Sequence, residues 1–233
     1  MLWLRLALTL VAAMDAPTGG GLTAALAQEE SGDTAGALDA LQALIQASPG
    51  SPLLRLESAR LRLKQGGDLE QTEHDLDVAA AASPHNPQLH FLRGQVWEER
   101  GRPLHAVRAY EEALENRPSY EEARFRLASL CAATGDWLKA ELHYRFLSAA
   151  RPEWVQVRLQ LARALEQQGR VGDTEQVLLR LREEQPTHVQ VLRQLADFYE
   201  HTGRPREAAK LRGTAPKPVE PPRKMRPLKP SRR

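Results

Sequence analysis

Apolar and small side chains recur along this chain in a unit of 34 residues. Each unit holds two stretches in which apolar residues lie three or four positions apart, the spacing of one face of an α-helix. A glycine separates the two stretches, and a proline closes the unit. The glycines are Gly32, Gly67, Gly101, Gly135, Gly169 and Gly203, and the prolines are Pro49, Pro84, Pro118, Pro152 and Pro186. Glycine suits the left-handed residue that ends a helix and proline stops the next one, so the pattern predicts two helices per unit.

Small and large residues also keep fixed places within the unit. In the first stretches, one column holds Gly94, Ala128, Ala162 and Ala196, and the column three residues later holds Trp97, Cys131, Leu165 and Tyr199. In the second stretches, Ala37, Ala106, Ala140 and Ala208 align. Small residues let two helix backbones approach closely, and large ones fill the space beside them. We therefore expect an all-α protein built from packed helix pairs.

These columns resemble the tetratricopeptide repeat, a helix–turn–helix unit of 34 residues. The resemblance implies a right-handed α-solenoid, with full repeats at 53–86, 87–120, 121–154 and 155–188. A partial repeat covers 22–52 and a partial cap covers 189–212, so the predicted solenoid domain is 28–212. The chain departs from the motif at Arg60, where a small residue is expected, and at Thr72 and Thr174, which replace alanines. His90, Arg124 and Arg158 replace the bulky aromatic residue that often opens the motif.

In this family, the inner face of the first helices forms a groove. Carried over by position, the resemblance implies a partner-binding groove made by Gln88, Phe91, Gln95, Glu122, Phe125, Ser129, Gln156, Leu159, Arg163, Gln190 and Arg193. The same positions include Glu57, Leu61 and Asp197. Phe91, Phe125 and Leu159 would form an exposed apolar strip suited to a protein or peptide ligand. The alternative is that Phe91 and Phe125 pack between neighbouring repeats.

Charge is unevenly distributed along the chain, although the net charge is only +2. Residues 213–233 are rich in proline and basic residues, which predicts a disordered tail. Its candidate contacts with anionic lipid, nucleic acid or an acidic partner are Arg223, Lys224, Arg226, Lys229, Arg232 and Arg233. A plain solubilising extension is the other interpretation of this tail.

The N-terminal residues 1–14 form an apolar run in which Arg5 is the one charged residue. The run is too short to span a bilayer and suits the apolar core of a secretory signal. With the small residues Ala25 and Ala27 as a cleavage pattern, residues 1–27 are predicted to be a signal peptide of a bacterial periplasmic or exported protein. The alternatives are an uncleaved membrane anchor and a cytoplasmic protein. If the segment is not cleaved, residues 22–31 form the first helix of a first repeat, and Ala25 falls in the small-residue column.

Catalytic motifs are missing from the sequence. The seven histidines form no pair at helical spacing, and no phosphate-binding glycine loop or nucleophile elbow occurs. The single cysteine, Cys131, falls in a core column and is expected to be a small buried hydrophobe. We therefore expect no enzyme, no metal, no cofactor and no small-molecule substrate. The expected function is an interaction scaffold that assists assembly of an envelope, pilus, secretion or motility complex.

Overall fold

The computed structural model describes residues 16–214, and all secondary structure within that range is helical. The described residues belong to two compact units, the first ending at Ala150 and the second beginning at Arg151. The helices of the first unit are α2 (Ala16–Glu30), α3 (Thr34–Ala47), α4 (Pro52–Gln65), α5 (Leu69–Ala82), α6 (Pro87–Glu99), α7 (Pro103–Asn116), α8 (Glu121–Ala133) and α9 (Trp137–Ala150). Those of the second unit are α10 (Val155–Gln167), α11 (Val171–Glu184), α12 (Val189–His201) and α13 (Pro205–Thr214).

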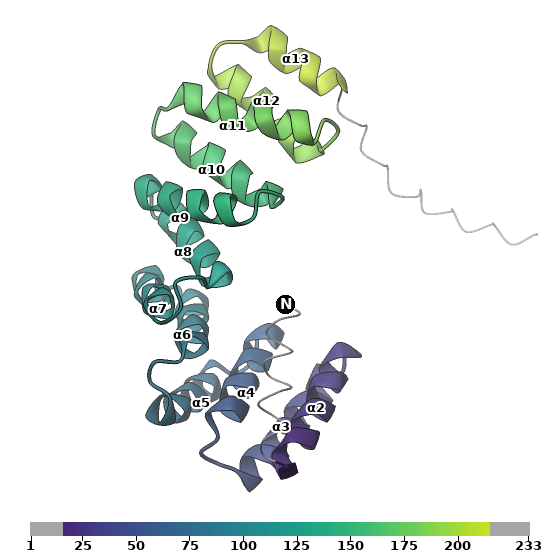
Figure 1. Ribbon diagram of the computed structural model, residues 1–233, viewed down its shortest axis with the longest axis vertical. Helices are drawn as coiled ribbons and strands as arrows, with labels where there is room; N and C mark the ends of the chain where they lie inside the picture. The colour runs from purple at the N-terminus through teal and green to yellow at the C-terminus, as the bar shows by residue number, and fades with distance from the viewer. Residues whose placement is uncertain (1–15, 215–233) are drawn as a thin grey trace, which may run out of the picture. The chain divides into compact units, whose positions relative to one another are not determined.

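Each unit is a series of helix pairs joined by short turns (Figure 1). Within a unit, the second helix of each pair packs against the first helix of the same pair. Where another pair follows in the unit, it also packs against the first helix of that pair. The small residues Ala37, Ala106, Ala140 and Ala208 are all fully buried at these contacts. The prediction of an all-α solenoid of helix pairs is therefore confirmed, and each repeat is stabilised chiefly by its neighbours.

The turn between the two helices of a pair is closed by a glycine with positive φ. At Gly101, φ is +64°, and the amide of Arg102 donates to the carbonyl of Trp97 over 2.8 Å. The expected glycine of the second pair, Gly67, was assigned wrongly, because Gly66 adopts the left-handed conformation there, with φ of +66°. Gly67 is an additional residue between that turn and Asp68, whose side chain caps the start of α5.

The additional residue shifts the register of α4 by one position. Counted from Gly66, the small-residue column of α4 is occupied by Ala59, which is 0% exposed, and not by Arg60. Leu61, expected to face the groove, is 1% exposed and belongs to the core between the first two pairs. The assignment of Leu61 to the groove was therefore wrong, whereas Glu57, although buried, contacts Arg60 and Gln88 on the face of the first helices.

The polar residues that replace the opening aromatic share one contact. His90 Nε2 lies 2.8 Å from the carbonyl oxygen of Pro84. Arg158 donates to the carbonyl of Pro152 over 3.2 Å, and Arg124 donates to that of Pro118. In three repeats, therefore, this side chain satisfies the proline carbonyl that closes the preceding repeat, a polar substitute for the apolar packing of an aromatic ring.

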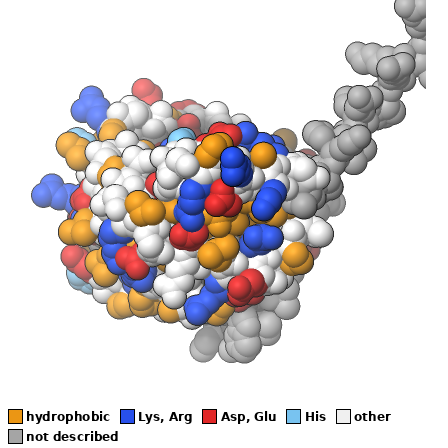
Figure 2. All heavy atoms as spheres, turned by 90° about the horizontal axis from the view of Figure 1, so that it is seen from above, with side chains coloured by type: hydrophobic (Ala, Val, Ile, Leu, Met, Phe, Trp, Pro, Cys, Tyr) orange, Lys and Arg blue, Asp and Glu red, His pale blue; other side chains and the backbone are white. Residues whose placement is uncertain are grey.

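The surface carries charges of both signs. On the face that Figure 2 draws, basic and acidic side chains are interspersed, and apolar side chains form small patches between them. Such mixing is typical of a protein surface that does not rely on one strong field to attract its ligand.

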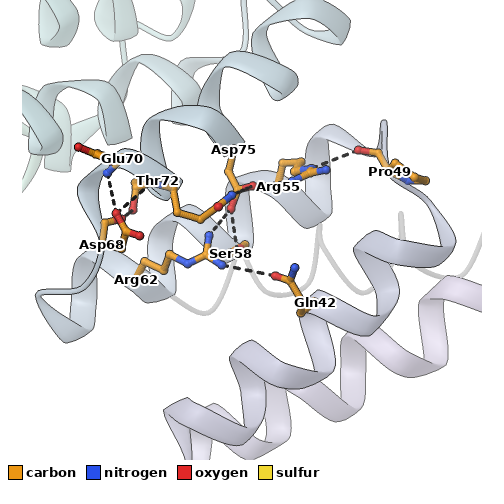
Figure 3. A network of polar contacts seen from close by, with 10 residues as sticks. Gln42, Pro49, Arg55, Ser58, Arg62, Asp68, Glu70, Thr72 and Asp75 are labelled. Carbon is orange, nitrogen blue, oxygen red and sulfur yellow. Dashed lines mark hydrogen bonds and ion pairs between the residues drawn. The ribbon is translucent and has the colours of Figure 1, made fainter.

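A buried carboxylate joins α4 to α5. Asp75 accepts hydrogen bonds from Arg55 and Arg62, each over 2.6 Å, and from the hydroxyl of Ser58 over 2.9 Å (Figure 3). Asp75 is almost completely buried, and its two arginine partners are largely buried as well. Three of its partners are supplied by α4, and Gln71 of α5 adds a longer contact at 3.5 Å, so this carboxylate fixes how the two helices of the pair meet.

Candidate protein-binding surface

The first helices of the first unit are linked by polar contacts on one face. Arg60 of α4 forms paired hydrogen bonds with Glu29 of α2, at 2.9 and 2.6 Å, and its Nε lies 2.8 Å from Glu57. Gln88 of α6 donates to Glu57 over 3.3 Å. Lys64 adds a second cation to Glu29 at 2.8 Å. These bonds join three successive first helices into one polar surface.

Glu29 is the anionic centre of this surface. Its hydrogen bond with Arg60, together with that from Lys64, lowers the pKa of the Glu29 carboxyl to about 2, although burial acts in the opposite direction. The carboxylate is therefore charged at every physiological pH, and it orients both cations toward the same face.

A hollow of ≈ 320 Å³ lies beside these contacts. It is lined by Arg60, Leu63, Lys64, Phe91, Gln95, Glu98, Glu99 and Arg126. The ring of Phe91 is partly buried and lies 5.1 Å from the ring of Tyr120 and 5.7 Å from that of Tyr110. Phe91 also packs against the core cluster that contains Leu56 of α4 and Leu76 of α5, so it lies between neighbouring repeats, as the alternative interpretation held, and it contributes an apolar side chain to the hollow.

Glu98 also lines the hollow and forms two polar contacts. Its carboxylate accepts a hydrogen bond from the hydroxyl of Tyr110 and forms an ion pair with Arg126 of α8 at 3.4 Å. Burial, with the nearby Glu98 charge, raises the pKa of Tyr110, so its hydroxyl stays protonated and acts as a donor. The hollow therefore combines an apolar side chain with fixed charges of both signs.

The other predicted groove residues of the first unit lie on α8 and are less tightly grouped. Phe125 packs edge-on against Tyr144, with ring centroids 6.2 Å apart, and the hydroxyl of Ser129 lies 3.2 Å from that of Tyr144. Glu122 is exposed. Phe125 and Ser129 therefore support the packing of α8 on α9.

The predicted groove residues of the second unit divide into two kinds. Gln156, Arg163, Gln190 and Arg193 are exposed. Leu159 is 3% exposed and belongs to the core of this unit, so the expectation that it forms part of an exposed apolar strip was wrong. The carbonyl of Leu159 accepts a hydrogen bond from Gln194 of α12 over 2.9 Å, which places the residue at the contact between two pairs.

Five charged residues of the hollow were not among the predicted groove residues: Arg60, Lys64, Glu98, Glu99 and Arg126. Two of them lie on α4, whose register was misplaced by the additional glycine. Counting the repeat from Gly66 would have put Arg60 at the position of Gln95 and identified it from the sequence alone.

Cys131 is the single cysteine of the chain and lies on α8. Cys131 is buried, as expected, and burial raises the pKa of its thiol to about 11, so the thiol is protonated and a poor nucleophile. No group of three or more potential metal ligands gathers among the described side chains. Over the same residues, no helix has the length and apolar character needed to cross a membrane. The predicted tail contacts, from Arg223 to Arg233, lie outside the described residues.

The fold and this surface define a helical repeat protein of the interaction-scaffold class. Models of the tetratricopeptide repeat match residues 22–51, 99–153 and 155–198. The chain belongs to the tetratricopeptide repeat family.

Solved structures of low sequence identity share the fold. A tetratricopeptide repeat protein from Parabacteroides merdae is 20% identical, with a TM-score of 0.67 over 83% of this chain and 77% of that one. PilW, a type IV pilus biogenesis factor, is 16% identical, with a TM-score of 0.69 over 84% and 90% of the two chains. YrrB, a repeat protein with an unusual peptide-binding site, is 14% identical, with a TM-score of 0.66 over 76% and 91%.

A curated relative matches in sequence over part of its length. The cellulose synthase operon protein C of Xanthomonas axonopodis pv. citri is 29% identical over an alignment 146 residues long that covers 57% of this chain. The matched region spans 10% of that relative's own length.

Proposed function

We propose that this protein is a non-catalytic scaffold that binds a segment of a partner protein in the hollow beside Phe91, and that it thereby assists assembly of a multi-protein complex of the bacterial envelope. The hollow carries the proposal, because it offers an apolar side chain surrounded by preorganised charges on the first-helix face of one compact unit.

The comparisons support the class of partner and the setting. YrrB has a peptide-binding site, PilW is a pilus biogenesis factor, and the matched relative is encoded in a cellulose synthase operon, as their names state. An assembly role at the envelope would agree with the apolar N-terminal run of this chain. Export to the periplasm remains part of the proposal and is tested by cell fractionation together with the mass of the mature protein.

The side chains that line the hollow indicate which kind of segment would bind there. Arg60, Lys64 and Arg126 already have carboxylate partners in the protein. A bound segment therefore need not bring an equal number of acids, and we expect it to place an apolar side chain beside Phe91 with polar groups at its borders. Because the surface is polar and partly preordered, such a segment would bind with moderate affinity, with a Kd on the order of 1–100 μM.

The test places a photo-crosslinking residue at Gln95, in the hollow, and a matched one at Gln176, on the exposed side of α11. We expect a partner to be crosslinked from Gln95 and not from Gln176. We further expect Gln95→Trp, which fills the hollow, to abolish the association while far-UV circular dichroism stays unchanged. Equal crosslinking from both positions, or association that survives Gln95→Trp, would place the function elsewhere.

The tail supplies a second candidate function. Residues 213–233 contain seven basic residues and one acid, which favours contact with an anionic surface or an acidic partner. Binding through the tail is expected to weaken steeply with salt and to disappear when 213–233 are deleted. Binding in the hollow is expected to survive the deletion.

A further inference from the structure

From α3 to α11 the second helices expose one face at equivalent positions. These are the second, sixth and tenth residues of each helix, which lie one turn apart and so share a face. In α9 they are Leu138, Leu142 and Phe146, which are 73%, 64% and 45% exposed. The corresponding residues are Ala35, Asp39 and Ala43 in α3, Glu70, His74 and Val78 in α5, Leu104, Arg108 and Glu112 in α7, and Gly172, Gln176 and Arg180 in α11.

The repeat itself does not require large apolar residues at these places. Among the described second helices, α9 is the one that carries three of them in line, whereas α7 keeps one, Leu104, and the other equivalent positions of α7 and α11 hold glycine, polar or charged residues. Single exposed leucines are common on protein surfaces, whereas an aligned row on one helix face is typical of a contact surface. We call these three side chains the α9 ridge, which extends for about 12 Å along the helix.

A cation without an acidic partner lies at one end of the α9 ridge. The guanidinium of Arg124 stacks on the ring of Phe146, with 3.7 Å between its Cζ and the ring centroid. Its polar contacts are the carbonyl of Pro118 and Nδ1 of His143, at 3.3 Å. Among the described residues, no carboxylate forms an ion pair with Arg124.

The equivalent residues of two other repeats do have an acidic partner. Nδ1 of His90 lies 3.0 Å from the carboxylate of Glu112, and Arg158 pairs with Glu184. Glu112 occupies in α7 the place that Phe146 occupies in α9. In repeat 121–154 an aromatic ring thus stands where repeat 87–120 has the acid, and Arg124 stacks on that ring.

We propose that the α9 ridge and Arg124 form a second docking surface, whose ligand is an amphipathic helix of a partner protein with apolar residues one turn apart and a carboxylate that reaches Arg124. A ridge of one side chain per turn packs into the groove of another helix. The carboxylate would supply the partner that Glu112 supplies to His90. The basic tail of this chain has the wrong charge for Arg124.

Charge on the flanks of the ridge argues for a protein partner over an anionic membrane. Lys139 and Arg145, which lie beside the ridge, are paired with Glu111 and Glu141. The surface around the ridge is therefore not a cluster of free cations, which a membrane surface would require.

The test uses the full chain and an alanine-based helical peptide of about 16 residues, with leucines one turn apart and a glutamate one turn beyond them. Two matched peptides change the glutamate to lysine or the leucines to serine. We expect the first peptide to shift the amide resonances of α8 and α9 saturably, with a Kd on the order of 1 mM or tighter. The lysine peptide is expected to bind about tenfold more weakly, and the serine peptide not to bind.

The variants introduce into α9 the residues that α7 carries at the equivalent positions, where they are compatible with the fold. Leu142→Arg and Phe146→Glu copy Arg108 and Glu112, and the second would supply Arg124 with an internal carboxylate. Both are expected to abolish peptide binding with the melting temperature retained. Leu104→Gln, which removes the isolated exposed leucine of α7, is the control and is expected to bind as the unmodified chain does.

Several results would overturn the proposal. These are the absence of a saturable shift, equal binding of the glutamate and lysine peptides, and binding retained by Leu142→Arg. A dimer in sedimentation that disappears in Leu142→Arg would assign the ridge to a second copy of this chain. Binding of phosphatidylglycerol vesicles through the same residues would assign it to a membrane.

Discussion

Removal of residues 1–27 is expected to unfold the first helix pair, because the predicted cleavage point lies inside α2. Leu22 and Ala25 are 2% and 1% exposed, and both belong to the core cluster that contains Ala37 and Leu41 of α3. The two helices also approach closely, since a Cβ at Gly21 would lie 2.6 Å from Cδ2 of Leu44. Cleavage after Ala27 would remove these contacts and expose the facing side of α3.

The expected cost follows from the area that returns to water. Burial of one leucine side chain contributes about 2 kcal/mol and that of an alanine methyl group about 0.8 kcal/mol, so the two residues contribute about 3 kcal/mol. Because a terminal repeat has a neighbour on one side only, a loss of this size is concentrated in α3 and is not shared along the chain.

The assay compares a protein that begins at Ala16 with one that begins at Gln28. Hydrogen exchange of the α3 amides is expected to be protected in the first protein and fast in the second, with a fall of about 3 kcal/mol in the free energy of local opening. Equal protection of α3 in both proteins would refute the reasoning. The same contacts predict that, if the chain is exported and processed, the mature protein retains Leu22 and Ala25.

Three further predictions concern single side chains. Burial, with the charge of Arg124, lowers the pKa of His143 to about 4, below its ordinary 6.5. The unfolded chain therefore binds a proton that the folded chain does not, and stability is lost as pH falls from 6.5 to 4, by at most about 3 kcal/mol. His143→Val, the residue of α11 at this place, is expected to reduce the acid dependence of urea unfolding. Asp75→Ala leaves two buried arginines unpaired and is expected to cost about 3–5 kcal/mol, measured by urea unfolding. Ala106→Leu overpacks a fully buried contact and is expected to cost about 1–3 kcal/mol, measured by thermal melting.

Each of these has a result that would contradict it. An identical pH dependence for His143→Val would show that other groups govern acid unfolding. A change below about 1 kcal/mol for Asp75→Ala would mean that water replaces the carboxylate around its arginines. An unchanged melting temperature for Ala106→Leu would contradict the close approach of α6 and α7.

The candidate surface could be predicted only in part. Phe91 and Gln95 do line the hollow, because the positions that face the groove are fixed by the repeat. Arg60 was missed because one extra glycine shifts α4 by a residue, and a shift of one position turns a helix face by about 100°. Leu159 was misplaced for another reason, since an apolar residue at a groove position can equally be buried by its neighbours.

The sequence by itself determined the period, the two helices of each repeat and the family. These depend on local chemistry: glycine permits the left-handed turn, proline ends a helix, and small residues recur where helix backbones meet. The tertiary structure decided which of two adjacent glycines takes the turn, that Leu22 and Ala25 are core residues, and that Arg124 stacks on Phe146 with no acidic partner among the described residues. Those outcomes depend on contacts between side chains of different helices. A repeating pattern along the sequence does not specify these contacts.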